Sequence, residues 1–227
     1  MSIRDWPEEE RPQERLLREG SEHLSDAELL ALFLRSGQPG QSAVSLSRQA
    51  LNYFGDIRKL LSADCAAFCT LKGLGVVRYT QLQAALELSR RHLAISLREP
   101  DALNASHKVK RYLKARLRDL NHEIFAALIL DTQHRIVSFE QLASGTIDQA
   151  TVYPREVARV MLEHHASAVI FAHNHPSGCP SPSKADICLT HKLVSALALL
   201  DIRVLDHFIV ADQHIVSFAE EGLMQVN

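Results

Sequence analysis

The chain has 227 residues, 46% of them hydrophobic, which is enough for one or two domains with real cores. Its formal net charge of −2 gives no overall attraction to nucleic acid or acidic lipid, so any polyanion binding must be local. We find no signal or transit peptide, no apolar run of the roughly 18 residues that a membrane helix needs, and no disulfide framework among four cysteines. We therefore expect a cytoplasmic protein with no membrane partner.

Residues 1–95 have the patterns of a helical domain. A capping box at Ser25–Glu28 begins a helix that ends before Gly37, since glycine and proline follow the apolar run. Three more apolar-periodic runs predict helices at Val44–Phe54, Ile57–Leu61 and Tyr79–His92.

Two glycines flank Leu74 between two helical segments. Gly73 and Gly75 permit a tight turn whose backbone amides stand open at the start of the next helix, a geometry that suits phosphate. Residues 60–92 resemble a helix-hairpin-helix, a module that binds nucleic-acid backbones without reading bases. The resemblance implies DNA-backbone contact through Lys72, Gly73, Gly75 and Arg78. The alternative is a plain packing element or a dock for a partner.

The chain changes character after the helical domain. Residues 96–104 lose helical periodicity and include Pro100, so we place a linker there, before a second domain at 105–227. Lys108–Arg118 then holds six Lys and Arg with no acid, while apolar residues repeat at helical spacing. A nucleic-acid patch is one interpretation. We favour a core-facing helix with a solvated back, because the basic positions are those that the apolar stripe leaves over.

The second domain alternates strands and helices. A hairpin of Glu123–Leu130 and Arg135–Phe139 precedes a helix that begins near Pro154 and ends at His165. A buried strand, a helix and a second hairpin follow, at Ser167–Ala172, Ser183–Leu199, and Ile202–Val210 with His214–Phe218. This order predicts an α/β sandwich with a mixed sheet.

The most informative stretch follows the buried strand. His173 and His175 fall on the same side of an extended backbone, because strand side chains alternate, so both can face one metal ion. Three prolines and a glycine then force a loop, after which Ser183 has the residue type and position of a helix N-cap. Asp186, in the first turn of that helix, is brought back toward the strand end as a third ligand.

Two histidines and a carboxylate, with a fourth position for water, are the ligand count of a catalytic zinc site. We predict one zinc ion per chain, held by His173, His175 and Asp186. The alternative is a His-Asn-His loop that hydrogen-bonds its own turn. Cys179 is a possible zinc ligand by chemistry, but we interpret it as a loop residue, since three ligands are already present.

These residues also carry a family resemblance. His-x-His, seven residues, Ser, two residues, Asp resembles the JAMM motif of MPN-domain metallohydrolases. The longer His-Asn-His-Pro-Ser-Gly-x-Pro-x-Pro-Ser-x-x-Asp is similar to the signature of the bacterial RadC-like (UPF0758-type) proteins, although Cys179 stands where they often have Asp. The resemblance implies an MPN-type (JAMM, cytidine-deaminase-like) α/β sandwich, a zinc metallopeptidase activity, and a peptide or isopeptide-linked protein substrate.

A water on the metal needs a general base, which in metalloproteases is a carboxylate that does not ligate zinc. The resemblance places this base at Glu123; a mere strand-edge charge there, with Glu140 as the base, is the alternative. Ser183 could donate its hydroxyl to the oxyanion of a tetrahedral intermediate, besides capping its helix. His207 could steady a metal ligand, or be a satisfied sheet histidine.

A different class of function also has to be considered. The chain could be a nucleic-acid-binding, DNA-repair-associated protein whose MPN domain is a non-catalytic scaffold, because a fold does not fix a function. That alternative depends on residues 73–78, whereas the enzyme depends on residues 173–186.

Overall fold

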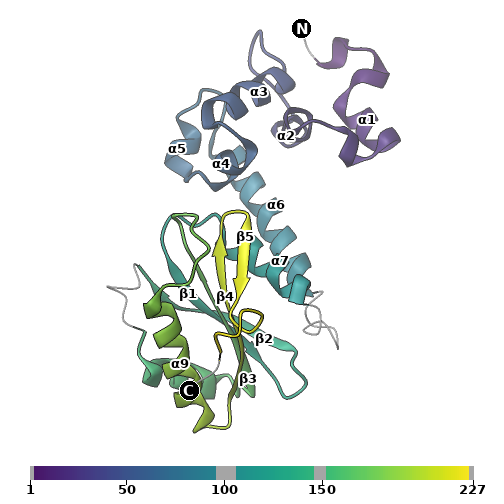
Figure 1. Ribbon diagram of the computed structural model, residues 1–227. Coiled ribbons are helices and arrows are strands. Elements are labelled where there is room, and N and C mark those ends of the chain that lie inside the picture. Colours follow the sequence, from purple (N-terminus) through teal and green to yellow (C-terminus); the bar gives the residue numbers. More distant parts are fainter. Residues whose placement is uncertain (1–2, 96–105, 146–151, 225–227) are drawn as a thin grey trace. The chain divides into compact units, whose positions relative to one another are not determined.

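The computed structural model describes residues 3–95, 106–145 and 152–224 (Figure 1). The chain forms two compact units, residues 1–89 and 90–227, and the division falls within one helix. The linker expected at 96–104 lies outside the described residues. Across those described ranges, no helix combines the length and the apolar character needed to cross a membrane.

The N-terminal unit is helical, as predicted. Its helices are α1 (Pro12–Glu19), α2 (Asp26–Leu34), α3 (Ala43–Phe54), α4 (Ile57–Ser62), α5 (Cys65–Cys69) and α6 (Val76–Ile95), with 3-10 turns at Ile3–Asp5, Glu8–Glu10 and Ser21–His23. The predicted capping box is present at the start of α2, where Ser25 and Glu28 each accept the other's backbone N–H. The sequence did not reveal α1, which buries Pro12 alone and so lacks an apolar stripe.

One hydrophobic cluster joins α2 to α6 within this unit. Leu74, the residue between the two glycines, is 4% exposed and belongs to that cluster. The other buried members are Leu30, Leu34, Leu46, Ala50, Leu60, Phe68, Leu71 and Leu82. The glycine turn therefore has a packing role whatever else it does.

The C-terminal unit is built on a five-stranded sheet in the order β2-β1-β3-β4-β5. The strands are β1 (Ile124–Leu130), β2 (Ile136–Ser144), β3 (Ala168–Asn174), β4 (Arg203–Ala211) and β5 (His214–Ser217). β3 and β4 run parallel and the other neighbours antiparallel, which confirms the predicted mixed sheet. β2 continues to Ser144, past the predicted end at Phe139, because its pairing with β1 extends to Ile124.

Helices cover both faces of this sheet (Figure 1). On one face α7 (Ser106–Leu117) buries Val109, Tyr112, Leu113 and Leu117, which confirms the core-facing interpretation of the basic segment. On the other face lie α8 (Pro154–Glu163) and α9 (Lys184–Ala198). The polar side of α7 contacts the C-terminal segment, where Lys110 Nζ lies 2.6 Å from Glu220 Oε2.

The two central strands are buried on both faces. All seven residues of β1 and all seven of β3 are buried, which is why β1 and the first five residues of β3 are continuous apolar runs in the sequence. The crossover from β3 through α9 to parallel β4 places the predicted ligand loop and the start of α9 at the carboxyl end of β3. In open α/β sheets, this is the edge where ligands bind.

Candidate metal centre

The end of β3 is fixed by its two neighbours. His173 lies opposite Phe125 of antiparallel β1 and beside Ile209 of parallel β4. His175 N continues the pairing with β4 by donating to Val210 O at 2.9 Å. Both histidines therefore remain on extended backbone, and the period of two directs both imidazoles to the same face.

A turn and a helix cap bring Asp186, the third predicted ligand, back toward the end of β3. Gly178 N donates to His175 O at 2.9 Å, with proline second and glycine fourth as type I turns favour. At the start of α9, Ser183 Oγ accepts from Asp186 N (3.1 Å), and Asp186 Oδ2 accepts from Ser183 N (2.7 Å). This capping box orients the Asp186 carboxylate toward the end of β3.

The three predicted ligands converge. His173 Nε2 and His175 Nε2 are 2.9 Å apart, Asp186 Oδ1 is 3.5 Å from His173 Nε2, and Asp186 Oδ2 is 3.7 Å from His175 Nε2. Tetrahedral zinc with bonds of ~2.0–2.1 Å separates its ligand atoms by about 3.3 Å. The separations lie around that value, so side-chain adjustments of a few tenths of an ångström fit the site to one ion.

The electrostatics of the site also favour a cation. Burial lowers the pKa of His173 to about 4, although the charge of Asp186 acts in the opposite direction, so this imidazole is neutral near pH 7. His175 Nδ1 lies 2.7 Å from Cys179 O, and because a carbonyl only accepts, Nδ1 carries a proton and Nε2 is the ring nitrogen left to bind a metal.

Asp186 adds a buried negative charge to these lone pairs. Its side chain is fully buried, and Oδ1 has no hydrogen-bond partner within the described part of the chain. Leaving a buried carboxylate oxygen unsatisfied is unfavourable unless a cation compensates it. Two imidazoles and one carboxylate are a donor set that suits zinc and related divalent ions.

Glu123 lies at the same edge of the sheet. It immediately precedes β1, and continuing the pairing of Phe125 with His173 places it opposite His175. A carboxylate oxygen of Glu123 and a ring nitrogen of each histidine lie within 4.8 Å of one another. The rival base, Glu140, lies in β2 with Oε1 3.5 Å from His164 Nε2, and it is outside this cluster.

Asn174, between the two histidines, fixes Glu123 from the other side of the strand. Its Oδ1 accepts from Ile124 N at 2.8 Å, and its Nδ2 donates to His122 O at 3.0 Å. These two peptide groups flank Glu123, so one buried amide connects the histidine pair to the carboxylate. In the sequence, the only sign of this role is a polar residue at the end of a buried strand.

A hollow of about 620 Å³ gives access to the centre from one side. Its walls come from the segments before β1, after β2 and after β3, and its lining residues are Asn121, His122, Glu123, Gly145, His175, Pro176, Ser177, Cys179 and Ser181. A substrate in this hollow would lie directly against Glu123 and His175.

The N-terminal turn has a different geometry from a bare phosphate site. Gly73 has φ +95°, and a Cβ there would collide with the Gln38 side chain. The Arg78 guanidinium donates to Gly73 O and, at 2.5 Å, to Ser36 O, so it connects the turn to the loop after α2. DNA contact stays a prediction, and it now rests on exposed Lys72 and the backbone of the turn.

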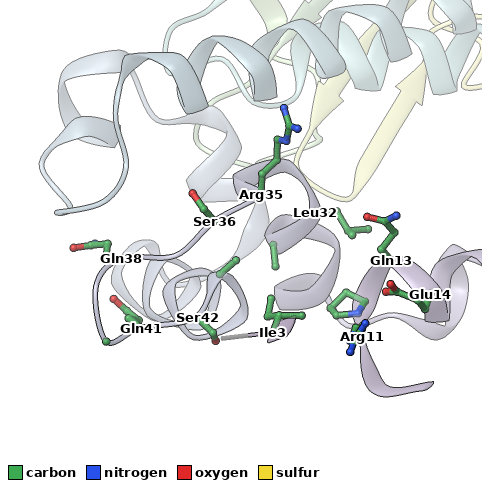
Figure 2. Close-up of a pocket in the computed structure, with 14 residues that line it drawn as sticks. Ile3, Arg11, Gln13, Glu14, Leu32, Arg35, Ser36, Gln38, Gln41 and Ser42 are labelled. Atoms are coloured by element: carbon green, nitrogen blue, oxygen red, sulfur yellow. The ribbon is translucent and has the colours of Figure 1, made fainter. Parts of the chain in front are cut away.

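A larger hollow of about 940 Å³ lies in the N-terminal unit. Figure 2 shows polar side chains around it from α1 and its approach, such as Arg11 and Gln13, and from the loop after α2, such as Ser36, Gln38 and Gln41. Glu14 is the one acidic residue in its lining, and neither histidine nor cysteine contributes. The larger hollow is therefore not the one that contains the candidate metal-binding residues.

The fold and the His-x-His and Asp geometry together define a JAB-type α/β domain with a candidate metal centre. Residues 103–223 match the RadC-like JAB domain family, and residues 3–80 match the UPF0758 N-terminal family. The chain belongs to the UPF0758 family, whose C-terminal part is this RadC-like JAB domain.

Full-length relatives support that assignment. The chain is 55% identical to a UPF0758 protein of Nitrosococcus oceani, over 99% of this chain and 100% of the relative. It is 57% and 58% identical to UPF0758 proteins of Azotobacter vinelandii and Chromohalobacter salexigens, in each case over 98% of this chain and 99% of the relative. These names state no activity.

The two hydrogen bonds of Asn174, to Ile124 N and His122 O, form a clamp around Glu123, and we expect their removal to destabilise the fold. Asn174→Leu should lower the free energy of unfolding of the C-terminal unit by about 1–3 kcal/mol, because Ile124 N and His122 O lose their buried partner. Hydrogen exchange of the β1 amides should accelerate accordingly. Asn121→Leu, the same change at an exposed position, should alter exchange little; equal exchange in both variants would contradict the clamp.

The helix-hairpin-helix resemblance predicts binding to DNA duplexes that is independent of sequence and weakens steeply with salt. Lys72→Gln should weaken it and reduce the salt slope by about one. Lys59→Gln, another exposed lysine, is the matched control. Arg78→Gln should also weaken binding, but it loses the Ser36 contact as well, so its folding must be checked. Fluorescence anisotropy with short labelled duplexes that detects no binding at low salt would refute DNA contact.

Proposed function

We propose that the protein is a zinc-dependent metallohydrolase of the JAMM type that cleaves a peptide or isopeptide bond. The observation that carries this proposal is the convergence of His173 Nε2, His175 Nε2 and the buried, unsatisfied Asp186 Oδ1 beside the Glu123 carboxylate. The match to the RadC-like JAB domain supports the same class of protein.

The metal-ligating residues and Glu123 would have separate roles. Zinc held by His173, His175 and Asp186 would supply a Lewis acid for the scissile carbonyl and a water whose pKa is lowered toward ~7. Glu123 accepts a proton from the attacking water at a carboxylate oxygen. It then delivers that proton to the departing amine nitrogen, as general bases in hydrolysis do when they become acids.

Ser183 would act on the carbonyl oxygen of the substrate. Its Oγ accepts from Asp186 N, so its own hydroxyl proton remains available for donation. The side chain is exposed at the N-terminus of α9, where the helix dipole also favours negative charge. Its capping role and the proposed donation to an oxyanion are therefore compatible.

The hollow beside Glu123 is compatible with a peptide-like substrate. Its lining includes polar residues from the segments before β1 and after β3, such as Asn121 and Ser177, with which a peptide could form hydrogen bonds. Glu123 and His175 both line this hollow, so a bound amide would contact the proposed base and one of the proposed metal ligands.

Two substitutions separate the base from the ligand. Glu123→Gln should keep zinc bound and the fold unchanged, while hydrolysis falls by roughly 10²–10⁴, the usual contribution of general acid–base catalysis. Asp186→Asn should lose or weaken zinc itself, because a neutral amide is a poor ligand. We would measure zinc per chain by mass spectrometry and turnover on a panel of peptide and isopeptide-linked substrates.

Glu140→Gln is the matched control, since Glu140 pairs with His164 outside the centre. Full activity in Glu123→Gln with loss in Glu140→Gln would move the base to β2. Zinc retained in the native chain without turnover on any substrate would instead favour the non-catalytic scaffold.

A further inference from the structure

A buried hydrogen-bonded chain runs behind the metal ligands. His207 of β4 is fully buried, with Nε2 2.8 Å from His173 Nδ1 and Nδ1 2.6 Å from Thr190 Oγ1. Thr190 of α9 is also fully buried, and its hydroxyl donates to Asp186 O at 2.7 Å. This series of hydrogen bonds thus starts at the backbone of Asp186 and ends at the ring of His173.

The number of protons available determines which group donates in each hydrogen bond of this series. Thr190 has one hydroxyl proton, and Asp186 O can only accept, so the hydroxyl is committed to that carbonyl. Thr190 Oγ1 must then accept from His207 Nδ1, which carries a proton. In a neutral ring this leaves His207 Nε2 as the acceptor of a proton from His173 Nδ1, and His173 Nε2 keeps its lone pair.

We infer that Thr190 and His207 are positioning residues that hold His173 in the tautomer able to bind a metal at Nε2 and connect that ligand to Asp186. The inference rests on the proposed metal site. Neither Thr190 nor His207 would touch the ion or a substrate. Two of the proposed ligands, His173 and Asp186, would then both depend on the Thr190 hydroxyl, which contacts His207 and Asp186 O.

Among the described residues, the groups around the His207 ring are mostly aromatic. Aromatic rings pack against it, with centroids 5.4 Å away for Phe125, 6.3 Å for Phe171 and 4.6 Å for Phe218. Thr190 and His173 are therefore the polar groups that its ring nitrogens meet. If the Thr190 hydroxyl is removed, His207 can carry its proton on Nε2 and donate to His173, which moves the His173 proton to Nε2, where it blocks the metal.

The test compares zinc affinity in matched variants of the full chain. Thr190→Val keeps the shape but removes the acceptor, and it should weaken zinc binding by about 10–100-fold, the usual effect of losing an outer partner of a metal ligand. Thr190→Ser should restore it. Thr80→Val makes the same change at an exposed helical site and should have no effect. Competition with a chromogenic chelator measures each affinity.

His207 offers a second comparison. His207→Gln can still accept from His173 through its amide oxygen and donate to Thr190 through its amide nitrogen, so it should bind zinc more tightly than His207→Leu. Apparent melting temperatures of the metal-free variants separate a folding defect from a specific loss of affinity.

The tautomers can be read directly without metal. Long-range ¹H–¹⁵N spectra of the metal-free protein should show the protons of His173 and His207 on Nδ1, and Thr190→Val should disturb this assignment. Native zinc affinity in folded Thr190→Val, or His173 protonated at Nε2 in the native chain, would overturn the positioning role. A native chain that binds no zinc would overturn the proposed site itself, whatever the spectra show.

Discussion

The register between β1 and β3 is the constraint on which the candidate centre depends. Pairing Phe125 with His173 places Glu123 opposite His175, and it puts Asn174 where its amide can hold both peptide groups around Glu123. Because side chains alternate along a strand, a slip of one residue would send the histidines to the opposite face. Burial of both strands on both faces prevents such a slip, so the hydrophobic core sets the geometry of the polar site.

The same burial sets the chemistry. His173, His207 and Asp186 are fully buried, and burial lowers the pKa of both His173 and His207, so their rings stay neutral and present lone pairs. The buried Asp186 carboxylate lies beside a neutral imidazole, and a divalent cation would compensate its charge. The buried core thus surrounds a candidate charged site at its edge, and the hollow beside Glu123 connects that site to solvent.

The site residues whose positions follow from local strand and helix patterns could be predicted from the sequence. His173 and His175 follow from strand periodicity, and Asp186 follows from a helix cap three residues away, so these positions could be expected to meet. The contacts of Asn174, His207 and Arg78 join residues 50, 34 and 42 positions apart, and only the folded register and packing determine them. For that reason the sheet and its helices could be predicted from the sequence and the candidate ligands named from it, whereas the Asn174 hydrogen bonds, the Thr190 contact and the Arg78 contact with Ser36 could not.

We propose that the His173, His175 and Asp186 side chains bind one metal ion. X-ray absorption spectroscopy of the zinc-loaded full chain is the sharpest test, because it reports the atoms around the metal. We expect one zinc per chain with imidazole scattering and nitrogen or oxygen neighbours at ~2.0–2.1 Å. A sulfur neighbour at ~2.3 Å would place Cys179 in the coordination sphere and contradict the ligand set. Zinc scattering without imidazole would contradict the site altogether.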